Sequence, residues 1–419
     1  MKTKDYANTL ICTVGTSLFM PNLAKLDPET LYQSDPAPSD PNGISEKRLL
    51  EHAGLWDDRE RLKAVLANVK RFYLEKEWSL LAKELVHLPP ALRLLGAEIN
   101  SIAAMISKCF LSEDRIRLVF MVSDTEDGAN IGAILKHYFS NRDCVIGFRE
   151  CTCLPVKGLQ DEKPTVFQVE GLSNLVRIMG EQLRKWGNES IAINATGGYK
   201  AQIALAVAFG QVTHTPVYYK HERFDQVIRF PRMPFAIDLS LVDAHLSLWA
   251  NLAEPGACLT ATEMDAMLPG DEEGREQICP MMDSIDDGNK TYFAISALGL
   301  VYWEAYLTRN PGVKIMPAKA GKRNGCNFRD DHYPIGFKEH ANKVYNTAVD
   351  FINECHSLPY DHQKSIKQTR FYEKTGRIIG EYVDKNKFGA RFEILTEAQN
   401  SLERLWIVDY LNSNNDMDN

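Results

Sequence analysis

Short apolar runs alternate with amphipathic segments through the first 240 residues of the chain. The apolar runs predict strands at 9–17, 117–122, 145–152, 191–193 and 216–219. Helices are predicted over 45–86, 172–186 and 200–212. A further helix is expected to begin at 94, and another follows the turn at 123–128 and ends at 139. A loop rich in Pro, Asp and Ser is predicted at 27–43. Strands that alternate with helices across short turns predict an α/β fold with a doubly wound parallel sheet. In such sheets ligands bind outside the carboxyl ends of the strands.

Two glycine-containing turns lie at such strand ends. Gly197 and Gly198 follow the strand at 191–193 and precede the helix that begins at Lys200. Glycine lets the backbone approach a ligand closely, and the first N–H groups and dipole of a helix favour negative charge, to which Lys200 adds a positive charge. The turn at 13–17 has the same order of apolar strand and Gly/Thr/Ser turn. Together the turns predict one pocket for a phosphate-bearing ligand; the alternative is that Gly197 and Gly198 only close a tight turn.

Beyond residue 240 the alternation stops. Residues 241–312 read as helices with one short strand: a capping box of Thr260 and Glu263 opens a helix, 290–295 predicts a wing strand, and a last helix begins at Ser296. This segment resembles a winged helix. Because its recognition positions, Glu263 and Asp265, are acidic, DNA is not an expected partner, and we interpret the segment as a dimerising connector.

A linker rich in Gly, Ala and Pro is predicted at 313–325, followed by a small α+β module at 326–412. In this module we expect a helix at 337–355, a basic and partly helical segment at 363–372, and strands at 377–383, 390–395 and 405–411 that form an antiparallel meander. Residues 412–419 are predicted to be a polar, frayed end.

Composition narrows the class of protein. The chain has 419 residues and a net charge of −8, yet residues 314–412 carry 16 Lys/Arg against 13 Asp/Glu, so any nucleic acid is expected to meet the tail. Nine scattered cysteines fit reduced thiols, and Cys151 and Cys153 lack the further ligands of a zinc site. With no apolar run of about 18 residues and no signal-peptide pattern, we expect a soluble, cytoplasmic protein without a membrane partner.

The N-terminal motifs resemble the CRISPR-associated Rossmann-fold (CARF) domain over about residues 1–240. The motifs are Thr13-Val14-Gly15-Thr16-Ser17-Leu18 with Asn22, Ala97-Glu98-Ile99-Asn100-Ser101, Ser123-Asp124-Thr125, Gly171-Leu172 and Asn194-Ala195-Thr196-Gly197-Gly198-Tyr199-Lys200-Ala201, with the signature extending through 231–234. This resemblance implies a homodimer that binds cyclic oligoadenylate, the second messenger of type III CRISPR systems, on its two-fold axis. We expect a ring of four adenylates, acting as an allosteric activator rather than a cofactor.

The resemblance also implies the residues that contact the ligand. One wall would be formed by Gly15, Thr16, Ser17, Asn22, Ser123, Asp124 and Thr125, and the other by Thr196, Gly197, Gly198 and Lys200. Asp124 suits ribose hydroxyls better than phosphate.

CARF domains usually control the activity of an effector domain in the same chain, so the tail module should determine which activity the ligand switches on. A HEPN ribonuclease needs Arg and His four to six residues apart, a PD-(D/E)xK nuclease needs an acid-x-Lys pair on a strand, and a deaminase needs spaced His and Cys ligands; the tail has none of these patterns. Its helix, basic segment and meander resemble the RelE-type mRNA interferases, which act on mRNA in the ribosomal A site. The resemblance implies metal-independent cleavage by the ribose 2′-OH, assisted by cations.

We align the tail with RelE-type enzymes so that Arg391 matches the family's catalytic strand arginine. In this alignment the candidate catalytic residues are Arg370, Arg377, Lys385, Lys387 and Arg391, with Tyr410 as an acid or base. A register shifted by one strand would instead favour Lys364, Lys367 and Arg404. The predicted function is a cyclic oligoadenylate-activated, ribosome-dependent mRNA endoribonuclease that assists type III CRISPR defence. The alternatives are a ligand-responsive transcription regulator and a ring nuclease that degrades its own ligand.

Overall fold

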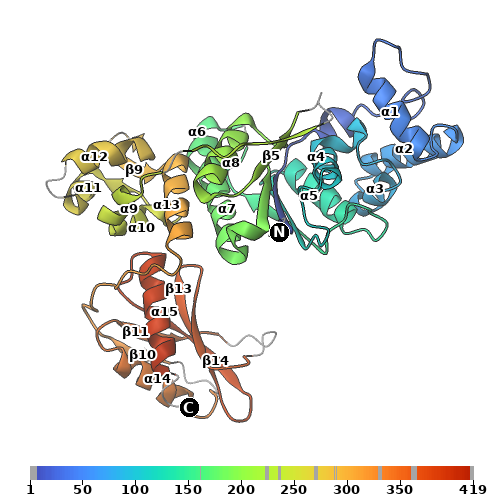
Figure 1. Cartoon of the computed structure of the whole chain (residues 1–419). Coiled ribbons are helices and arrows are strands. Elements are labelled where there is room, and N and C mark those ends of the chain that lie inside the picture. Colours follow the sequence, from blue (N-terminus) through green and yellow to red (C-terminus); the bar gives the residue numbers. More distant parts are fainter. Residues whose placement is uncertain are drawn as a thin grey trace, which may run out of the picture. The chain divides into compact units, whose positions relative to one another are not determined.

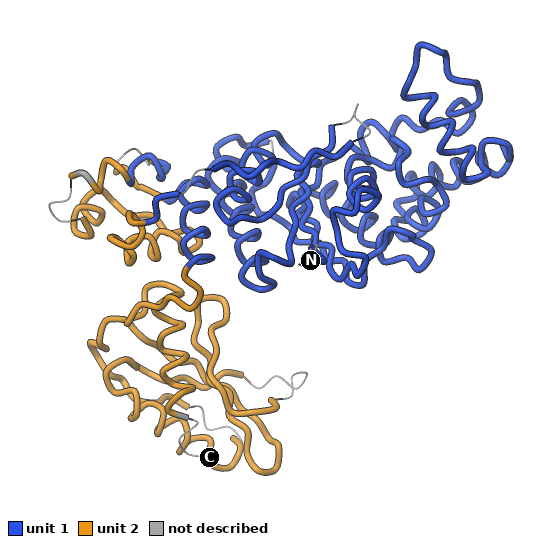
Figure 2. Tube along the Cα trace, viewed as in Figure 1, with its two compact units in different colours: residues 1–239, 278–283, 295–309 blue, residues 240–277, 284–294, 310–419 orange. Residues whose placement is uncertain are grey.

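The computed structural model describes residues 7–160, 162–221, 226–234, 237–268, 272–286, 288, 290–328, 333–359 and 366–415. The chain divides into two compact units (Figure 2): residues 1–239, 278–283 and 295–309 form unit 1, and residues 240–277, 284–294 and 310–419 form unit 2. Residues of the predicted connector at 241–312 therefore occur in both units. None of the described helices is both long enough and apolar enough to cross a membrane.

A six-stranded sheet forms the centre of unit 1 (Figure 1). Its order is β3-β2-β1-β4-β5-β6, built from β1 (Thr9–Thr13), β2 (Arg117–Ser123), β3 (Glu150–Val156), β4 (Ile191–Asn194), β5 (Val217–Lys220) and β6 (Val227–Arg229). The first five strands are parallel, and β6 runs antiparallel to β5. The chain places β2 and β3 on one side of β1 and then returns to place β4 on the other, so the order reverses between β1 and β4. The predicted doubly wound parallel sheet is confirmed, and its ligand-binding crevice is expected between β1 and β4.

Helices cover this sheet on both faces (Figure 1). The longer ones are α1 (Pro41–His52), α2 (Arg59–Leu74), α3 (Trp78–Leu85), α4 (Gly96–Ser107), α5 (Glu126–Phe139), α7 (Leu172–Trp186) and α8 (Lys200–Thr213), with short turns at η1 (Leu18–Leu23), η2 (Arg93–Leu95), α6 (Pro164–Val166), η3 (Phe167–Gly171) and η4 (Asn188–Ser190). Leu10 and Phe120 of the strands pack in one buried cluster with Ile99 of α4 and Ile131 of α5. The predicted strand at 145–152 is wrong in its first residues, because Gly147 closes a turn on Cys144 and Val145 is exposed.

A helix from the second half of the chain belongs to unit 1. α13 (Ala297–Arg309) packs against α7 and α8. Its Glu304 is buried and forms an ion pair with Arg184 of α7, and Gly180 leaves the room for this carboxylate, because a Cβ there would overlap it.

The remaining part of the connector consists of short elements. They are α9 (Ser240–Ala244), α10 (Leu246–Ala253), β7 (Leu259–Thr260), α11 (Ala261–Met267), α12 (Glu272–Ile278), η5 (Cys279–Met281), β8 (Met282–Asp286) and β9 (Thr291–Ile295), and the strands pair in the order β7-β9-β8. The predicted capping box is confirmed, since Thr260 accepts from the Glu263 N–H and the Glu263 carboxylate accepts from the Thr260 N–H. The predicted wing strand is confirmed as β9.

The tail module is a five-stranded sheet with two helices on one face. The sheet order is β10-β11-β14-β13-β12, from β10 (Gly325–Asn327), β11 (Glu354–Ser357), β12 (Arg370–Lys374), β13 (Arg377–Val383) and β14 (Gly389–Leu395). Only β10 and β11 are parallel. α14 (Phe337–Thr347) and α15 (Ser401–Asn415) bury Phe337, Ile407 and Val408 against Phe371 and Phe392 of the sheet.

Several tail predictions are wrong. Residues 405–411 are helical, because the buried Ile407, Val408 and Leu411 lie on one side of α15 at helical spacing and pack in the tail core. The third strand of the meander is β12, which begins in the segment predicted to be partly helical at 363–372 and ends at Lys374. Residues 363–365 lie outside the described residues. The helix predicted at 337–355 ends at Thr347, and β11 follows.

The ends of the module also differ from the prediction. Residues 412–415 are not frayed: α15 continues through Asn415, and the Asn412 side chain bonds both the N–H and the carbonyl of Phe371. Residues 416–419 lie outside the described part. The linker at 313–325 has no helix or strand before β10, but Ile315 N–H donates to the Leu402 carbonyl and Ala320 N–H to the Asp350 carbonyl, so it packs along the tail module.

Candidate functional site

The two predicted glycine turns touch each other at the switch between β1 and β4. The Thr13 hydroxyl donates to the Gly197 carbonyl at 2.5 Å, and a Cβ on Gly15 would lie 2.7 Å from the Gly198 nitrogen. Gly198 has a φ of +94°, which glycine adopts without strain. The predicted proximity of the turns is confirmed, and only glycine permits so close an approach.

Three of the predicted ligand residues present exposed side chains at this edge. Thr16 lies in the first turn, Asp124 follows β2, and Lys200 begins α8. The Asp124 carboxylate also accepts from the Gly158 N–H at 2.9 Å, so it is held in place. Thr16 and Lys200, with the backbone N–H groups of the turns, are the groups best suited to an anion.

The other predicted ligand side chains hold the loops together. Ser17 Oγ accepts from the Ala97 N–H at 3.1 Å, and the Asn22 amide donates to the Arg93 carbonyl at 2.6 Å. Thr125 caps α5 by accepting from the Gly128 N–H at 3.1 Å, and it bonds Ser123 at 2.8 Å. Thr196 donates to Asn194 Oδ1 at 2.6 Å and accepts from the Lys220 N–H at 3.0 Å. These side chains therefore hold the loops of the site in place through bonds within the protein, and their predicted contacts with a ligand stay a prediction.

The sequence interpretation gave no role to Glu98, which lies beneath both turns. Its side chain is 1% exposed, and Oε1 accepts from the Gly15 N–H at 2.7 Å. Burial raises the pKa of Glu98, although the bonds from the N–H groups of Gly15 and of Glu98 itself oppose the rise. In the sequence Glu98 is an ordinary acid in the first turn of the helix Gly96–Ser107, so no local signal indicates its partner.

In the tail, one transverse row of the sheet brings two predicted catalytic arginines together. Arg370 of β12, Glu381 of β13 and Arg391 of β14 are paired directly across the strands. The Glu381 carboxylate accepts from Arg391 Nε at 2.8 Å and from Arg370 Nε at 2.9 Å. Tyr372 donates to the same carboxylate at 3.3 Å. The sequence interpretation missed Glu381 and Tyr372.

This row lies on the face of the sheet opposite α14 and α15. Side chains alternate along a strand, and Phe371 and Phe392, which neighbour the row, point to the helical face. Glu381 is 4% exposed; burial alone would raise its pKa, but the hydrogen bonds and charges of Arg391 and Arg370 outweigh this and lower it. Two guanidinium groups on one carboxylate leave a net positive charge, which suits a phosphate.

The remaining predicted catalytic cations lie elsewhere on the module. Arg377 lies at the far end of β13, four residues from Glu381, and pairs with Glu393. Lys385 and Lys387 are exposed in the loop that joins β13 and β14, two strand rows beyond Arg391. Tyr410 lies on α15 and stacks on Trp406, with ring centres 5.3 Å apart. Lys367 is exposed before β12, and Lys364 lies outside the described residues.

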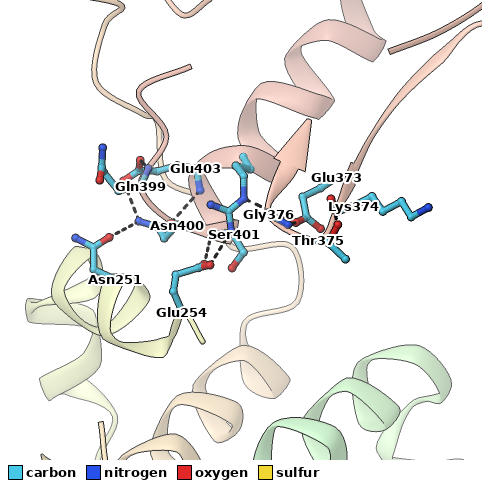
Figure 3. Close-up of polar contacts among 11 residues, drawn as sticks. Asn251, Glu254, Glu373, Lys374, Thr375, Gly376, Gln399, Asn400, Ser401 and Glu403 are labelled. Carbon is cyan, nitrogen blue, oxygen red and sulfur yellow. Dashed lines mark hydrogen bonds and ion pairs between the residues drawn. The ribbon is translucent and has the colours of Figure 1, made fainter. Parts of the chain in front are cut away.

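A polar contact joins the end of α10 to the start of α15 (Figure 3). Arg404 is buried and takes part in it. Its Nη2 donates to Glu254 Oε2 at 2.7 Å, and Glu254 also accepts from the Ser401 N–H. Asn400, which is 0% exposed, caps α15 through Glu403 N–H and donates to Asn251 Oδ1 at 2.8 Å. These bonds join the connector helix to the tail within unit 2.

A cavity of about 790 Å³ lies at the opposite, amino-terminal edge of the unit 1 sheet. Its lining includes Ala7, Glu189 and Pro216, which precede β1, β4 and β5, together with the cations Lys108 and Arg229. We place the candidate site at the glycine turns instead, because there the backbone N–H groups, a helix start and Lys200 converge. Within the described ranges, no three His, Cys, Asp or Glu side chains gather as a metal site.

A comparison with known protein families matches the part of the chain that contains the turns after β2 and β4. The model of a family described as CRISPR-associated protein (Cas_APE2256) matches residues 93–233. The matched segment contains α4 with Glu98, the turn after β2 and the glycine turn after β4. The CRISPR-associated part of the resemblance is thereby confirmed, while the connector and the tail lie beyond the match. No curated protein matches the chain.

Proposed function

We propose that this chain is a type III CRISPR ancillary effector, in which a homodimeric sensor binds cyclic oligoadenylate and activates a RelE-like module that cuts mRNA on ribosomes. The observation that carries the proposal is the CRISPR-associated family match over the segment that contains the turns after β2 and β4. The ligand class follows from the resemblance to CARF domains and is supported by the chemistry of the turns.

The sensor half is supported by the contact between the turns. Gly15, Gly197 and Gly198 bring two sets of backbone N–H groups to one edge, beside the exposed Lys200. In a two-fold dimer the same turns would face each other across the axis and hold the two halves of a symmetric ring. Four phosphates and their riboses then need both hydrogen-bond donors and positive charge, which Thr16 and Lys200 supply.

The effector half is supported by the row of Arg370, Glu381 and Arg391 on the face of the tail sheet opposite α14 and α15. In the proposed reaction the ribose 2′-oxygen attacks the neighbouring phosphorus, and the bond from phosphorus to the 5′-oxygen breaks. The 2′-hydroxyl loses its proton, the 5′-oxygen gains one, and a 2′,3′-cyclic phosphate remains. Arg391 and Arg370 would stabilise the negative charge that develops on the phosphate oxygens.

The decisive experiment compares cleavage of a translated mRNA with cleavage of the same mRNA without ribosomes, each with and without cyclic tetra-adenylate. We expect cutting only on ribosomes and only with the ligand. Arg391→Ala should reduce cutting by about 100-fold or more, because a cation on the developing charge is lost. Ligand binding, measured by calorimetry, should stay unchanged.

Three results would each contradict a different part of the proposal. Absence of ligand binding would reject the sensor, and undiminished cutting by Arg391→Ala would reject the assigned site. Ligand binding without any RNA cleavage would reject the effector. Lys319→Ala, which removes an exposed cation of the tail that pairs with Asp350 at 3.4 Å, is the matched control and should cut like the wild type.

A further inference from the structure

The carboxylate of Glu98 contacts both glycine turns at once. Oε1 accepts from the Gly15 N–H at 2.7 Å, and a Cβ added to Gly197 would overlap the same oxygen. The Gly15 nitrogen itself would lie 2.9 Å from that Cβ. Glu98 therefore occupies the space that a side chain at position 197 would fill, and it does so from a third element, the first turn of α4.

No cation neutralises this carboxylate among the residues that the structure describes. Its pKa is raised by burial, and the groups that oppose the rise are backbone N–H groups of Gly15 and of Glu98. The other titratable group that senses it is the buried thiol of Cys12 on β1. Oε2 has neither solvent contact nor a hydrogen-bond partner within the described ranges. Such a costly buried acid is expected to serve a purpose other than stability.

A second buried acceptor lies under the neighbouring glycine. Gln202 of α8 is 1% exposed, its Oε1 has no partner in the described part of the chain, and a Cβ on Gly198 would overlap that oxygen. Buried polar side chains therefore lie against both glycines of the turn: Glu98 against Gly197 and Gln202 against Gly198. Of the two, only Glu98 bonds the other turn.

We propose that Glu98 is a positioning residue that joins the two glycine turns through its acceptor oxygen, so that both face the same anionic ligand. This inference rests on the proposed sensor function for its ligand, but the joining of the turns does not depend on any ligand. It acts through Gly15 and Gly197 and makes no contact with the ligand itself.

The test compares Glu98→Ala, Glu98→Gln and, as a matched control, Glu304→Ala. Among the described residues of unit 1, Glu304 is the other buried acid, but it contacts α7 and not the turns. The first measurement is hydrogen exchange of the ligand-free proteins. Because the acceptor is lost, Glu98→Ala should raise exchange at the Gly15 amide and in the peptide at 194–200 by about 10-fold or more.

Glu98→Gln keeps an acceptor oxygen, so both turns should remain protected, and Glu304→Ala should leave them protected although it lowers the melting temperature. The second measurement is calorimetric binding of cyclic tetra-adenylate. Glu98→Ala should weaken binding by about 10-fold or more, and Glu98→Gln by less than about threefold. Because Glu304→Ala also removes a buried carboxylate, a general loss of packing would weaken binding in both alanine variants, whereas the positioning role predicts weaker binding in Glu98→Ala and not in Glu304→Ala.

The outcomes separate the inference from the proposed function. Wild-type protein that does not bind cyclic tetra-adenylate rejects the sensor function, and hydrogen exchange still decides the role of Glu98. Unchanged exchange at both turns in folded Glu98→Ala, or equal deprotection in Glu98→Gln, overturns the inference. If Glu98→Ala does not fold, Gly197→Ala replaces it: its Cβ should displace the carboxylate and expose the Gly15 amide, and a protected amide would overturn the inference.

Discussion

The carboxylate of Glu381 fixes where two candidate catalytic arginines point. It accepts from Arg370 and Arg391 through their Nε atoms, at 2.9 and 2.8 Å. Each arginine carries five N–H donors, so a single bond leaves most of the guanidinium fork for another acceptor. Glu381 thus orders two long side chains before any phosphate arrives, and this lowers the entropy cost of binding one.

The charge of Glu381 should be visible in the acid stability of the protein. The two arginines lower its pKa in the folded state despite burial, so its ionised form stabilises the fold above the ordinary value of 4.5. That stabilisation should be lost as the pH falls through the lowered folded pKa. We expect the melting temperature of the wild type to fall more steeply below pH 4.5 than that of Glu381→Gln. Parallel curves would show that the carboxylate is not held by the arginines.

Arg391 and Arg377 should differ strongly in their effect on mRNA cutting. Both were candidates on sequence grounds, but Arg391 shares a carboxylate with Arg370, whereas Arg377 pairs with Glu393 at the other end of β13. We expect Arg377→Ala to reduce cutting by less than about 10-fold, against about 100-fold or more for Arg391→Ala. The initial rates of cleavage of translated mRNA measure both, and equal losses would mean that the phosphate spans the length of the strand.

Individual residues were predictable where backbone conformation dictates them. Gly15, Gly197 and Gly198 stand where the chain must approach itself, and their role in the turns could be predicted from the pattern of apolar strand, glycine and helix. Glu381 and Glu98 could not, because their importance depends on partners 10 and 83 residues away. A lone acid in a strand or helix carries no local signal of such a partner.

At the scale of elements, prediction was accurate where periodicity and turn residues agree. The end of the helix at Leu172–Trp186 was placed to the residue, since Gly187 ends it with a φ of +78°, whereas at its start the helical turn η3 runs directly into it. α15 was mistaken for a strand because its apolar residues include Ile407 and Val408, which favour strands by propensity alone. Burial against the tail sheet decides their conformation, and that contact is not local in sequence.

The packing of α13 on α7 should depend on pH. Burial raises the pKa of Glu304 to about 7, although Arg184 opposes the rise. A folded pKa above the ordinary value of 4.5 means that the neutral acid is favoured in the fold. The contribution of Glu304 to stability should therefore be fully present below pH 4.5 and be lost as the pH rises through about 7. Glu304→Gln should remove this slope from the melting temperature measured between these limits; a slope that persists would assign it to other groups.

At the scale of the whole molecule, the two candidate sites lie in different units, and helices lead from each towards the connector. α8 begins at Lys200 beside the ligand turns and packs against α13, which ends at Arg309. In unit 2, α10 bonds the start of α15 (Figure 3). The family match could not have indicated either link, because it ends at residue 233. Both depend on contacts between segments more than 80 residues apart.

The contact between α10 and α15 should be required for activation by the ligand. Glu254 accepts from Ser401 and Arg404, and Asn251 accepts from the buried Asn400, so the combined change Asn251→Ala and Glu254→Ala removes the acceptors and leaves Arg404 without its closest partner. If the connector passes the signal to the tail here, the ligand-induced increase in mRNA cutting should fall by about 10-fold or more, while calorimetric affinity for cyclic tetra-adenylate stays the same. Asp409→Ala is the matched control, because it removes an exposed carboxylate of α15 that pairs with Lys314 and not with α10. An unchanged increase in the double variant would show that the tail responds through another route, and a lost affinity would show that the change had damaged the sensor.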